Sequence, residues 1–160
     1  MATIETLYGT SNQTITVTLT SLASAASRGS AAIDNSTTLF LDALIIVRSK
    51  TAAGTIGGDK CLYVYAYGTV DGGTTYGGSA TGTDATITLA SPPNVRLVGI
   101  VNMPVAATQY DAGPFSVAAA FGGNLPQKWG IIITNATGLA LSATGTDHVV
   151  RFQGIQAQSI

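Results

Sequence analysis

Strict alternation of polar and apolar residues is the feature that most constrains this chain. In residues 14–20 every odd position is Ile, Val or Leu, and every even position is Thr. A period of two places one face of an extended segment in a core and the other in solvent, and threonine itself favours β structure. Residues 115–121 repeat the alternation between two glycine-containing turns. Both segments are predicted to be half-buried strands.

Further strands are predicted where the chain is apolar on both faces or alternates less cleanly. The candidates are residues 39–48, 62–67, 85–90, 95–101, 129–134 and 148–156. Turns rich in Gly, Pro, Asn and Asp separate them. About eight or nine strands predict an all-β fold, a two-sheet antiparallel sandwich resembling a jelly roll. Residues 21–32, rich in Ala and Ser, are predicted to be extended or irregular, with a short helix as the alternative.

The charge content limits the kinds of partner that the chain can bind. Seven basic and eight acidic residues make up 9% of the 160 residues and give a net charge of −1. The basic residues are scattered, so the sequence predicts no positive patch for a phosphate backbone and no nucleic-acid partner. The length fits one sandwich domain over residues 13–160, preceded by an N-terminal arm over residues 1–12.

Targeting and membrane signals are not expected either. The N-terminus has no basic start followed by an apolar run. The apolar stretch 39–47 is interrupted by Asp42 and is too short to cross a bilayer. The single cysteine, Cys61, excludes an internal disulfide framework. We therefore expect a soluble protein made in a reducing compartment, without a membrane partner.

Residue types that carry catalysis are scarce. A nucleophilic triad needs a general base, and the only histidine is His148. Cys61 lies inside a predicted strand, where a buried, inert thiol is expected. The carboxylates are isolated in sequence, and most lie beside turn residues. We expect no catalytic residue, no cofactor and no metal site, although the Asp-Gly-Gly and Gly-Thr-Asp turns could supply oxygen ligands to a surface Ca²⁺.

A tyrosine stripe is the clearest candidate for a binding face. Tyr63, Tyr65 and Tyr67 lie at a spacing of two and therefore share one face of a strand. Such a face suits a protein partner or the stacking of a sugar. The alternative is that the rings pack in the sandwich with their hydroxyls at its edge. Trp129 is expected to pack in the core or at a strand end.

The N-terminal arm carries a second set of candidate interface residues. Ile4, Leu7 and Tyr8 are apolar anchors among small polar residues. A flexible tail does not need such side chains, so docking onto a neighbouring subunit is predicted. Deleting residues 1–9 is expected to weaken assembly and to leave the monomer folded.

Residues 32–47, 62–77 and 125–141 resemble a family of small structural proteins of tailed-bacteriophage virions. The resemblance implies a head decoration (cement) protein, which is made in the host cytoplasm and binds the major capsid protein on the outer surface of the head. It also implies a homo-oligomer, commonly a trimer at local three-fold positions, and it supplies no site residues. The alternative function is a carbohydrate-binding or receptor-binding sandwich module of the phage tail.

Overall fold

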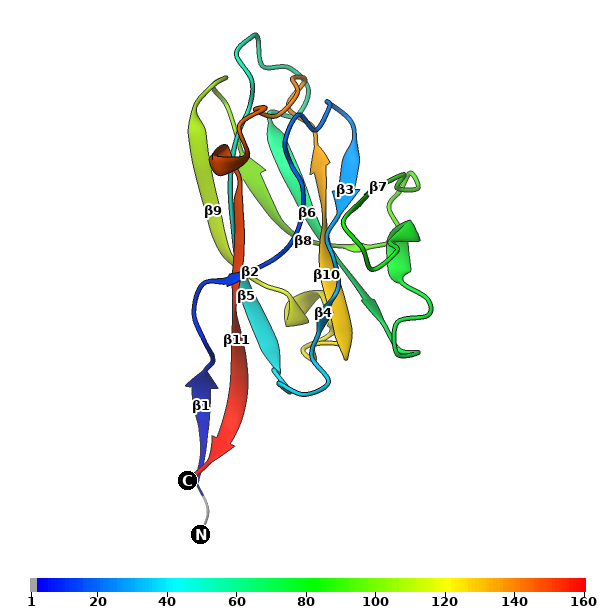
Figure 1. The fold of residues 1–160 in the computed structure, drawn as a ribbon, viewed down its shortest axis with the longest axis vertical. Coiled ribbons are helices and arrows are strands. Elements are labelled where there is room, and N and C mark those ends of the chain that lie inside the picture. The colour runs from blue at the N-terminus through cyan, green and yellow to red at the C-terminus, as the bar shows by residue number, and fades with distance from the viewer. Residues whose placement is uncertain (1–2) are drawn as a thin grey trace.

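Two antiparallel β-sheets pack face to face in the computed structural model, which describes residues 3–160 (Figure 1). The first sheet has the order β1-β11-β5-β9 and contains β1 (Ile4–Tyr8), β2 (Gln13–Thr14), β5 (Asp42–Lys50), β9 (Gln109–Ser116) and β11 (Val149–Ser159). The second has the order β7-β3-β10-β6-β8 and contains β3 (Ser27–Gly29), β4 (Ile33–Asp34), β6 (Cys61–Thr69), β7 (Ala85–Ile87), β8 (Arg96–Asn102) and β10 (Lys128–Asn135). Three short 3-10 turns complete the described structure: η1 (Gly77–Ser79), η2 (Ala118–Phe121) and η3 (Gly145–Asp147). The predicted all-β sandwich is confirmed.

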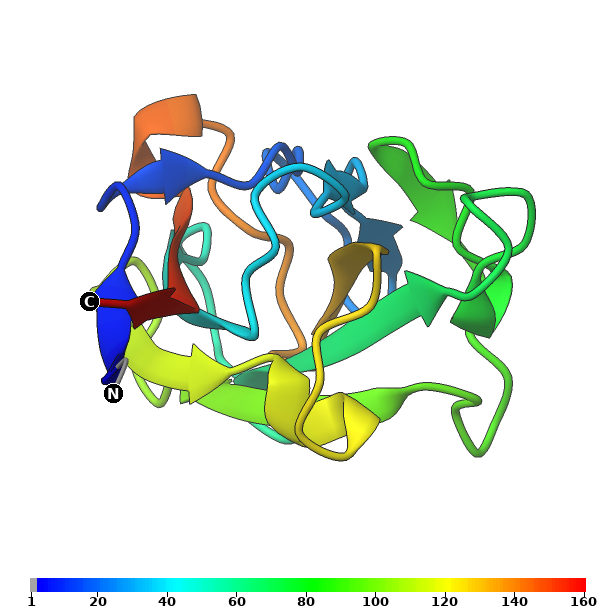
Figure 2. The same cartoon turned by 90° about the horizontal axis from the view of Figure 1, so that it is seen from below.

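The strands pair in a nested order. The last strand, β11, pairs with β1 and β2, and β10 pairs with β3 and β4. Inside these pairs, β9 lies against β5 and β8 against β6. A long hairpin rolled up in this way gives the two Greek keys of a jelly roll. At one margin of the sandwich β8 and β9 lie side by side (Figure 2). There the Phe115 ring covers Gly99.

The number of strands differs from the prediction because two strand positions of the jelly roll are each divided into two short strands. Residues 3–160 form eleven strands, against the predicted eight or nine. β1 and β2 occupy one position beside β11, and β3 and β4 occupy one position beside β10. β7 adds a short edge strand beyond β3. Met1 and Ala2, the first residues of the predicted arm, lie outside the described residues.

Two predicted strands have the wrong extent. In residues 14–20 only Thr14 belongs to a ladder, although Ile15 and Leu19 are buried as the alternation requires. This segment crosses between the sheets: the Ile15 N–H bonds to the Val150 carbonyl in one sheet, and the Thr16 carbonyl accepts from Ala31 near the other. In residues 115–121 the strand ends at Ser116, because η2 follows directly. The alternation of polar and apolar residues predicts which side chains are buried, but it does not predict which strand the backbone pairs with.

The main core lies between the sheets. Trp129, Ile131 and Ile133 of β10 face Ile45 and Val47 of β5, and all five side chains are fully buried. A smaller cluster lies on the outer face of the second sheet, where the segment between β6 and β8 folds over it. Its buried members are Tyr67, Ile87 and Ile132. Trp129 is therefore a core residue, as predicted.

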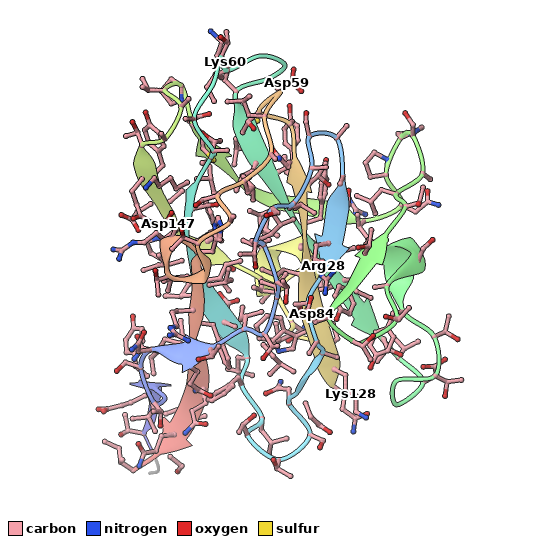
Figure 3. All side chains as sticks on the ribbon, turned by 45° about the horizontal axis from the view of Figure 1, so that its top comes forward. Arg28, Asp59, Lys60, Asp84, Lys128 and Asp147 are labelled. Atoms are coloured by element: carbon pink, nitrogen blue, oxygen red, sulfur yellow. The ribbon has the colours of Figure 1, made fainter. Side chains whose placement is uncertain are left out.

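An ion pair holds the covering segment, which lies between β6 and β8, against the rest of the sandwich. The Arg28 Nε lies 2.6 Å from Asp84 Oδ1, and the two side chains face each other in Figure 3. The Thr18 backbone N–H also donates to Asp84, at 3.1 Å. Partial burial raises the pKa of Asp84, but the hydrogen bonds from Arg28 and Thr18 outweigh it and hold the pKa below its ordinary value.

Described residues 3–160 contain no helix that is long and apolar enough to span a membrane.

The close fit of Tyr67 over β10 can be tested at Gly130. A Cβ added at Gly130 would overlap with the Tyr67 ring, whose hydroxyl is held at 2.6 Å from the Ser30 carbonyl. Gly130→Ala is therefore expected to lower the free energy of unfolding by about 1–3 kcal/mol, measured by urea denaturation. Gly145→Ala is the control, since nothing lies within 4 Å of its added Cβ. Equal stability of the two variants would contradict the packing described here.

Candidate functional site

The predicted interface residues fall into two separate places. Ile4, Leu7 and Tyr8 lie on β1, which projects beyond one end of the sandwich (Figure 1). The three tyrosines of the stripe lie on β6, an interior strand of the second sheet between β10 and β8. The structure therefore does not combine them into one surface, and each is described in turn.

A two-stranded ribbon forms because β11 is longer than the strand beside it. β5 pairs with β11 only as far as Ile155. From Ile155 to Ser159 the partner of β11 is β1, in antiparallel register, with Thr6 opposite Ala157. We call β1 together with residues 155–159 the ribbon. All five residues of β1 are exposed.

Large apolar side chains are exposed along the ribbon. Ile4 is 75% exposed and Tyr8 is 59% exposed, and Ile160, just beyond the ribbon, is 64% exposed. Leu7 is also exposed. Clustered apolar side chains in solvent are typical of surfaces that bind a partner.

The strand β1 has one paired edge, which faces β11, and one free edge. Thr3 and Ile160 exchange both N–H···O bonds, at 3.0 and 2.9 Å, and the Gly9 N–H donates to the Gly154 carbonyl at 2.9 Å. Antiparallel ladders alternate, so odd-numbered residues of β1 bond toward β11. The N–H and C=O groups of Ile4, Thr6 and Tyr8 consequently point to the other edge, where no described residue pairs with them.

A loop beside the ribbon extends this apolar surface, and sequence reasoning missed it. Asn35 is buried, and its side chain holds the loop in place. The Asn35 Oδ1 accepts from the Phe40 N–H, and the Asn35 Nδ2 donates to the Phe40 carbonyl, each at 2.8 Å. Leu39 and Leu41 remain exposed. The Leu41 N–H donates to the Ile155 carbonyl, so Leu41 flanks β11 on the side opposite to β1.

The loop was missed because it was predicted to belong to a strand. Residues 39–48 form one apolar run, but Leu39 has a φ of 52° and the strand starts only at Asp42. The signal that was available is the run of turn-forming residues from Asn35 to Thr38. We call Leu7, Leu39 and Leu41 the end surface.

The tyrosine stripe lies on the outer face of the second sheet and not between the sheets. Tyr67 is 1% exposed beneath the covering segment, where its ring meets the Tyr76 ring edge to face at 5.4 Å. It is therefore not open to a partner. Tyr63 and Tyr65 are half-buried, with ring centroids 6.3 Å apart and planes tilted by 40°.

Two shallow grooves meet at these half-buried rings. A groove of about 520 Å³ lies between Tyr65 and residues 86–91, and one of about 370 Å³ includes Tyr63, Tyr65 and Asp59. Ala25 and Thr134 border both grooves. Leu97 and Ile100 of β8 are exposed beside the tyrosines, since β8 pairs with β6 at these positions. The arrangement offers flat rings next to a few polar groups.

Asp59 fixes one of these rings. The Tyr63 hydroxyl donates to Asp59 Oδ2 at 2.9 Å, and Asp59 lies in the loop before β6 (Figure 3). A carboxylate that accepts this hydrogen bond favours the neutral phenol and raises the pKa of Tyr63 to about 12. Burial raises the pKa of the neighbouring Tyr65.

The remaining reactive residue types lie elsewhere. The Ser49 Oγ is 2.9 Å from His148 Nδ1, and His148 Nε2 is 3.0 Å from the Ser142 carbonyl. A carbonyl only accepts, so Nε2 carries a proton and donates to it. Ser49 is fully buried, and the pair joins β5 to the segment before β11. Burial raises the pKa of the Cys61 thiol. Within residues 3–160 no cluster of three His, Cys, Asp or Glu side chains is placed to hold a metal ion.

Comparison with family models, with curated proteins and with solved structures gave no match.

The anchoring of Tyr63 can be measured by titration. In ¹³C-tyrosine NMR spectra, assigned with Tyr63→Phe, Tyr63 is expected to ionise near pH 12. Asp59→Asn removes the charged acceptor, so the pKa of Tyr63 should fall toward 10, the ordinary value for tyrosine. Asp111→Asn, which removes a carboxylate paired with Arg48, is the control and should leave this pKa unchanged. Ionisation of Tyr63 near pH 10 in the unaltered protein would show that Asp59 does not hold it.

Proposed function

We propose that this protein is a non-enzymatic structural subunit of a tailed-bacteriophage virion. It decorates the outer surface of the head, binds the major capsid protein through protein–protein contacts, and stabilises the shell by adding buried interface between neighbouring capsid subunits. The end surface and the ribbon make the contact with the shell.

The projecting ribbon is the observation that carries this proposal. Its β1 residues are all exposed, and the large apolar ones among them contribute nothing to the core of their own chain. Burial of a leucine or isoleucine side chain against a partner is worth about 1.5–3 kcal/mol. A free monomer gains nothing from this surface, whereas a subunit of an assembly uses it for docking.

The jelly roll and the low charge agree with this role. Jelly rolls occur in viral capsid domains, but also in lectins, so the fold alone does not separate the two functions. The 9% of charged residues gives the surface little electrostatic repulsion. That property suits a protein held among many neighbours.

The copy number in virions tests the proposed location. Density-purified phage particles are digested with trypsin, and the peptide of residues 97–128 is quantified against peptides of the major capsid protein. A copy number comparable to that of the shell subunit is expected. Absence from particles would refute the virion role, and a few copies per particle would move the protein to the tail.

The end surface provides a mutational test of docking. Leu7→Ser combined with Leu41→Ser is expected to weaken binding to shells of the major capsid protein by about tenfold or more, because two buried leucines are lost. Both side chains are exposed in the free protein, so the fold should persist in circular dichroism.

Val70→Ser is the matched control for this experiment. Val70 is a fully exposed apolar residue in the turn after β6, away from the ribbon. It should bind shells as the unaltered protein does. Equal binding of all three proteins in a sedimentation assay would exclude the end surface as the docking site.

Carbohydrate binding is the second candidate function, and the tyrosine grooves favour it. Tyr63 and Tyr65 present two partly exposed rings within 6.3 Å of each other, and Asp59 and Thr134 supply polar groups beside them. Sugars bind to such combinations of flat aromatic faces and hydrogen-bonding groups. In this case the protein would act as a receptor-binding module of the tail.

Glycan binding can be separated from shell binding by substitution. If the grooves bind sugar, Tyr65→Ala should remove most of the signal on a glycan array, with the fold preserved. Tyr8→Ala is the control, because Tyr8 is an exposed tyrosine on the ribbon and not at the grooves. Absence of any glycan signal for the unaltered protein would eliminate this second function.

A further inference from the structure

The free edge of β1 is an unprotected template for another strand. The outward N–H and C=O groups of Ile4, Thr6 and Tyr8 have no partner among residues 3–160. Edge strands in other proteins are commonly shielded by Pro, Lys, a bulge or a covering loop. β1 (IETLY) contains neither Pro nor Lys, has Glu5 as its one charged residue, pairs with β11 without a register shift, and is exposed along its whole length.

We propose that two copies of this chain associate by antiparallel pairing of β1 with β1. The two ribbons join into one continuous four-stranded sheet in the order β11-β1-β1-β11. This inference concerns self-association, and it holds whether or not the protein decorates a capsid.

The alternation of backbone groups fixes the register of this pairing. Only even-numbered residues of β1 direct hydrogen-bonding groups to the free edge, so they must oppose even-numbered residues of the second copy. The register that uses all of them places Thr6 opposite Thr6 on a two-fold axis. Ile4 then lies opposite Tyr8 of the second copy, and each opposed pair exchanges both backbone bonds.

The side chains agree with this register. On one face of the joined sheet, Ile4 contacts Tyr8 of the second copy, and the two Thr6 side chains meet at the axis. Aromatic–β-branched and Thr–Thr pairs are among the favourable cross-strand combinations. On the other face Glu5 lies opposite Leu7, so no like charges are directly opposed.

The shape of the molecule leaves room for the second copy. β1 runs from the free tip of the ribbon toward the sandwich (Figure 1), and Thr3 and Ile160 pair at that tip. Antiparallel pairing of β1 with β1 therefore places the two sandwiches at opposite ends of the joined sheet. The surface is self-complementary about a two-fold axis, which is the commonest symmetry of homo-oligomers. A dimer differs from the trimer that the family resemblance implies, so the measured mass distinguishes them.

A proline substitution on the axis tests the proposed hydrogen bonds. Thr6→Pro removes an N–H that points to the free edge and leaves the bonds to β11 intact. In sedimentation equilibrium at about 100 μM, where a micromolar dimer is well populated, the unaltered protein should show the mass of two chains. Thr6→Pro should weaken association by about tenfold or more. Thr6→Ala keeps the N–H and is expected to dimerise nearly as well as the unaltered protein.

Cysteine cross-linking tests the register. Thr6→Cys places two thiols opposite each other with Cα atoms about 5.5 Å apart, within the range that a disulfide spans. It should form a covalent dimer on mild oxidation. Tyr8→Cys alone should not, because its counterpart lies about 13 Å away along the strand. The native Cys61 is buried in both variants.

Three results would overturn the proposal. These are a single-chain mass for the unaltered protein at every concentration, a three-chain mass, and dimerisation of Thr6→Pro equal to that of Thr6→Ala with both variants folded. If the chain stays single in solution but its β1 edge becomes protected on capsids, the edge pairs with a capsid strand instead. None of these results bears on the copy number in virions, so the proposed function is tested separately.

Discussion

The hydrogen-bonding capacity of β11 is the constraint on which the rest of the structure depends. A strand has two hydrogen-bonding edges, and β11, at eleven residues, reaches beyond the end of β5. β5 pairs with one edge of β11 as far as Ile155, and β1 pairs with the opposite edge from Ile155 to Ser159. The first strand of the chain is thereby held against the last one outside the sandwich. Its own outer edge is left without a partner, which makes it the natural point of contact with another chain.

The nested order of the jelly roll explains why this contact lies where it does. Because the first strand pairs with the last, the start of β1 and the end of β11 lie at the same end of the molecule (Figure 1). The loop from Asn35 to Leu41 also reaches this end and adds Leu39 and Leu41 to the exposed apolar side chains. Docking on a shell uses apolar side chains of this end, and pairing with a second copy uses the backbone edge of β1 together with cross-strand contacts of Ile4 and Tyr8.

How far the sequence predicts the structure depends on whether a feature is local. The strands β5, β6, β8, β10 and β11 were predicted within a few residues, because their apolar runs are local signals. The partner of a strand is not local, so residues 14–20 were assigned a ladder that they do not form. For the same reason the sequence did not predict what buries Tyr67: the rings were expected on a binding face or packed in the sandwich, whereas the segment after β6 covers Tyr67 on the outer face. Ile4, Leu7 and Tyr8 were predicted to be an exposed arm, but their pairing with the C-terminus has no signature in the sequence.

Amide hydrogen exchange, followed residue by residue by NMR, tests most directly whether the β1 edge is where copies associate. The amides of Glu5 and Leu7 bond to β11 and should be protected at every protein concentration. The amides of Ile4, Thr6 and Tyr8 should exchange freely in dilute protein and become protected as the concentration rises. Free exchange of these three amides in a concentrated, associated sample would contradict the account, because association would then not involve the edge of β1.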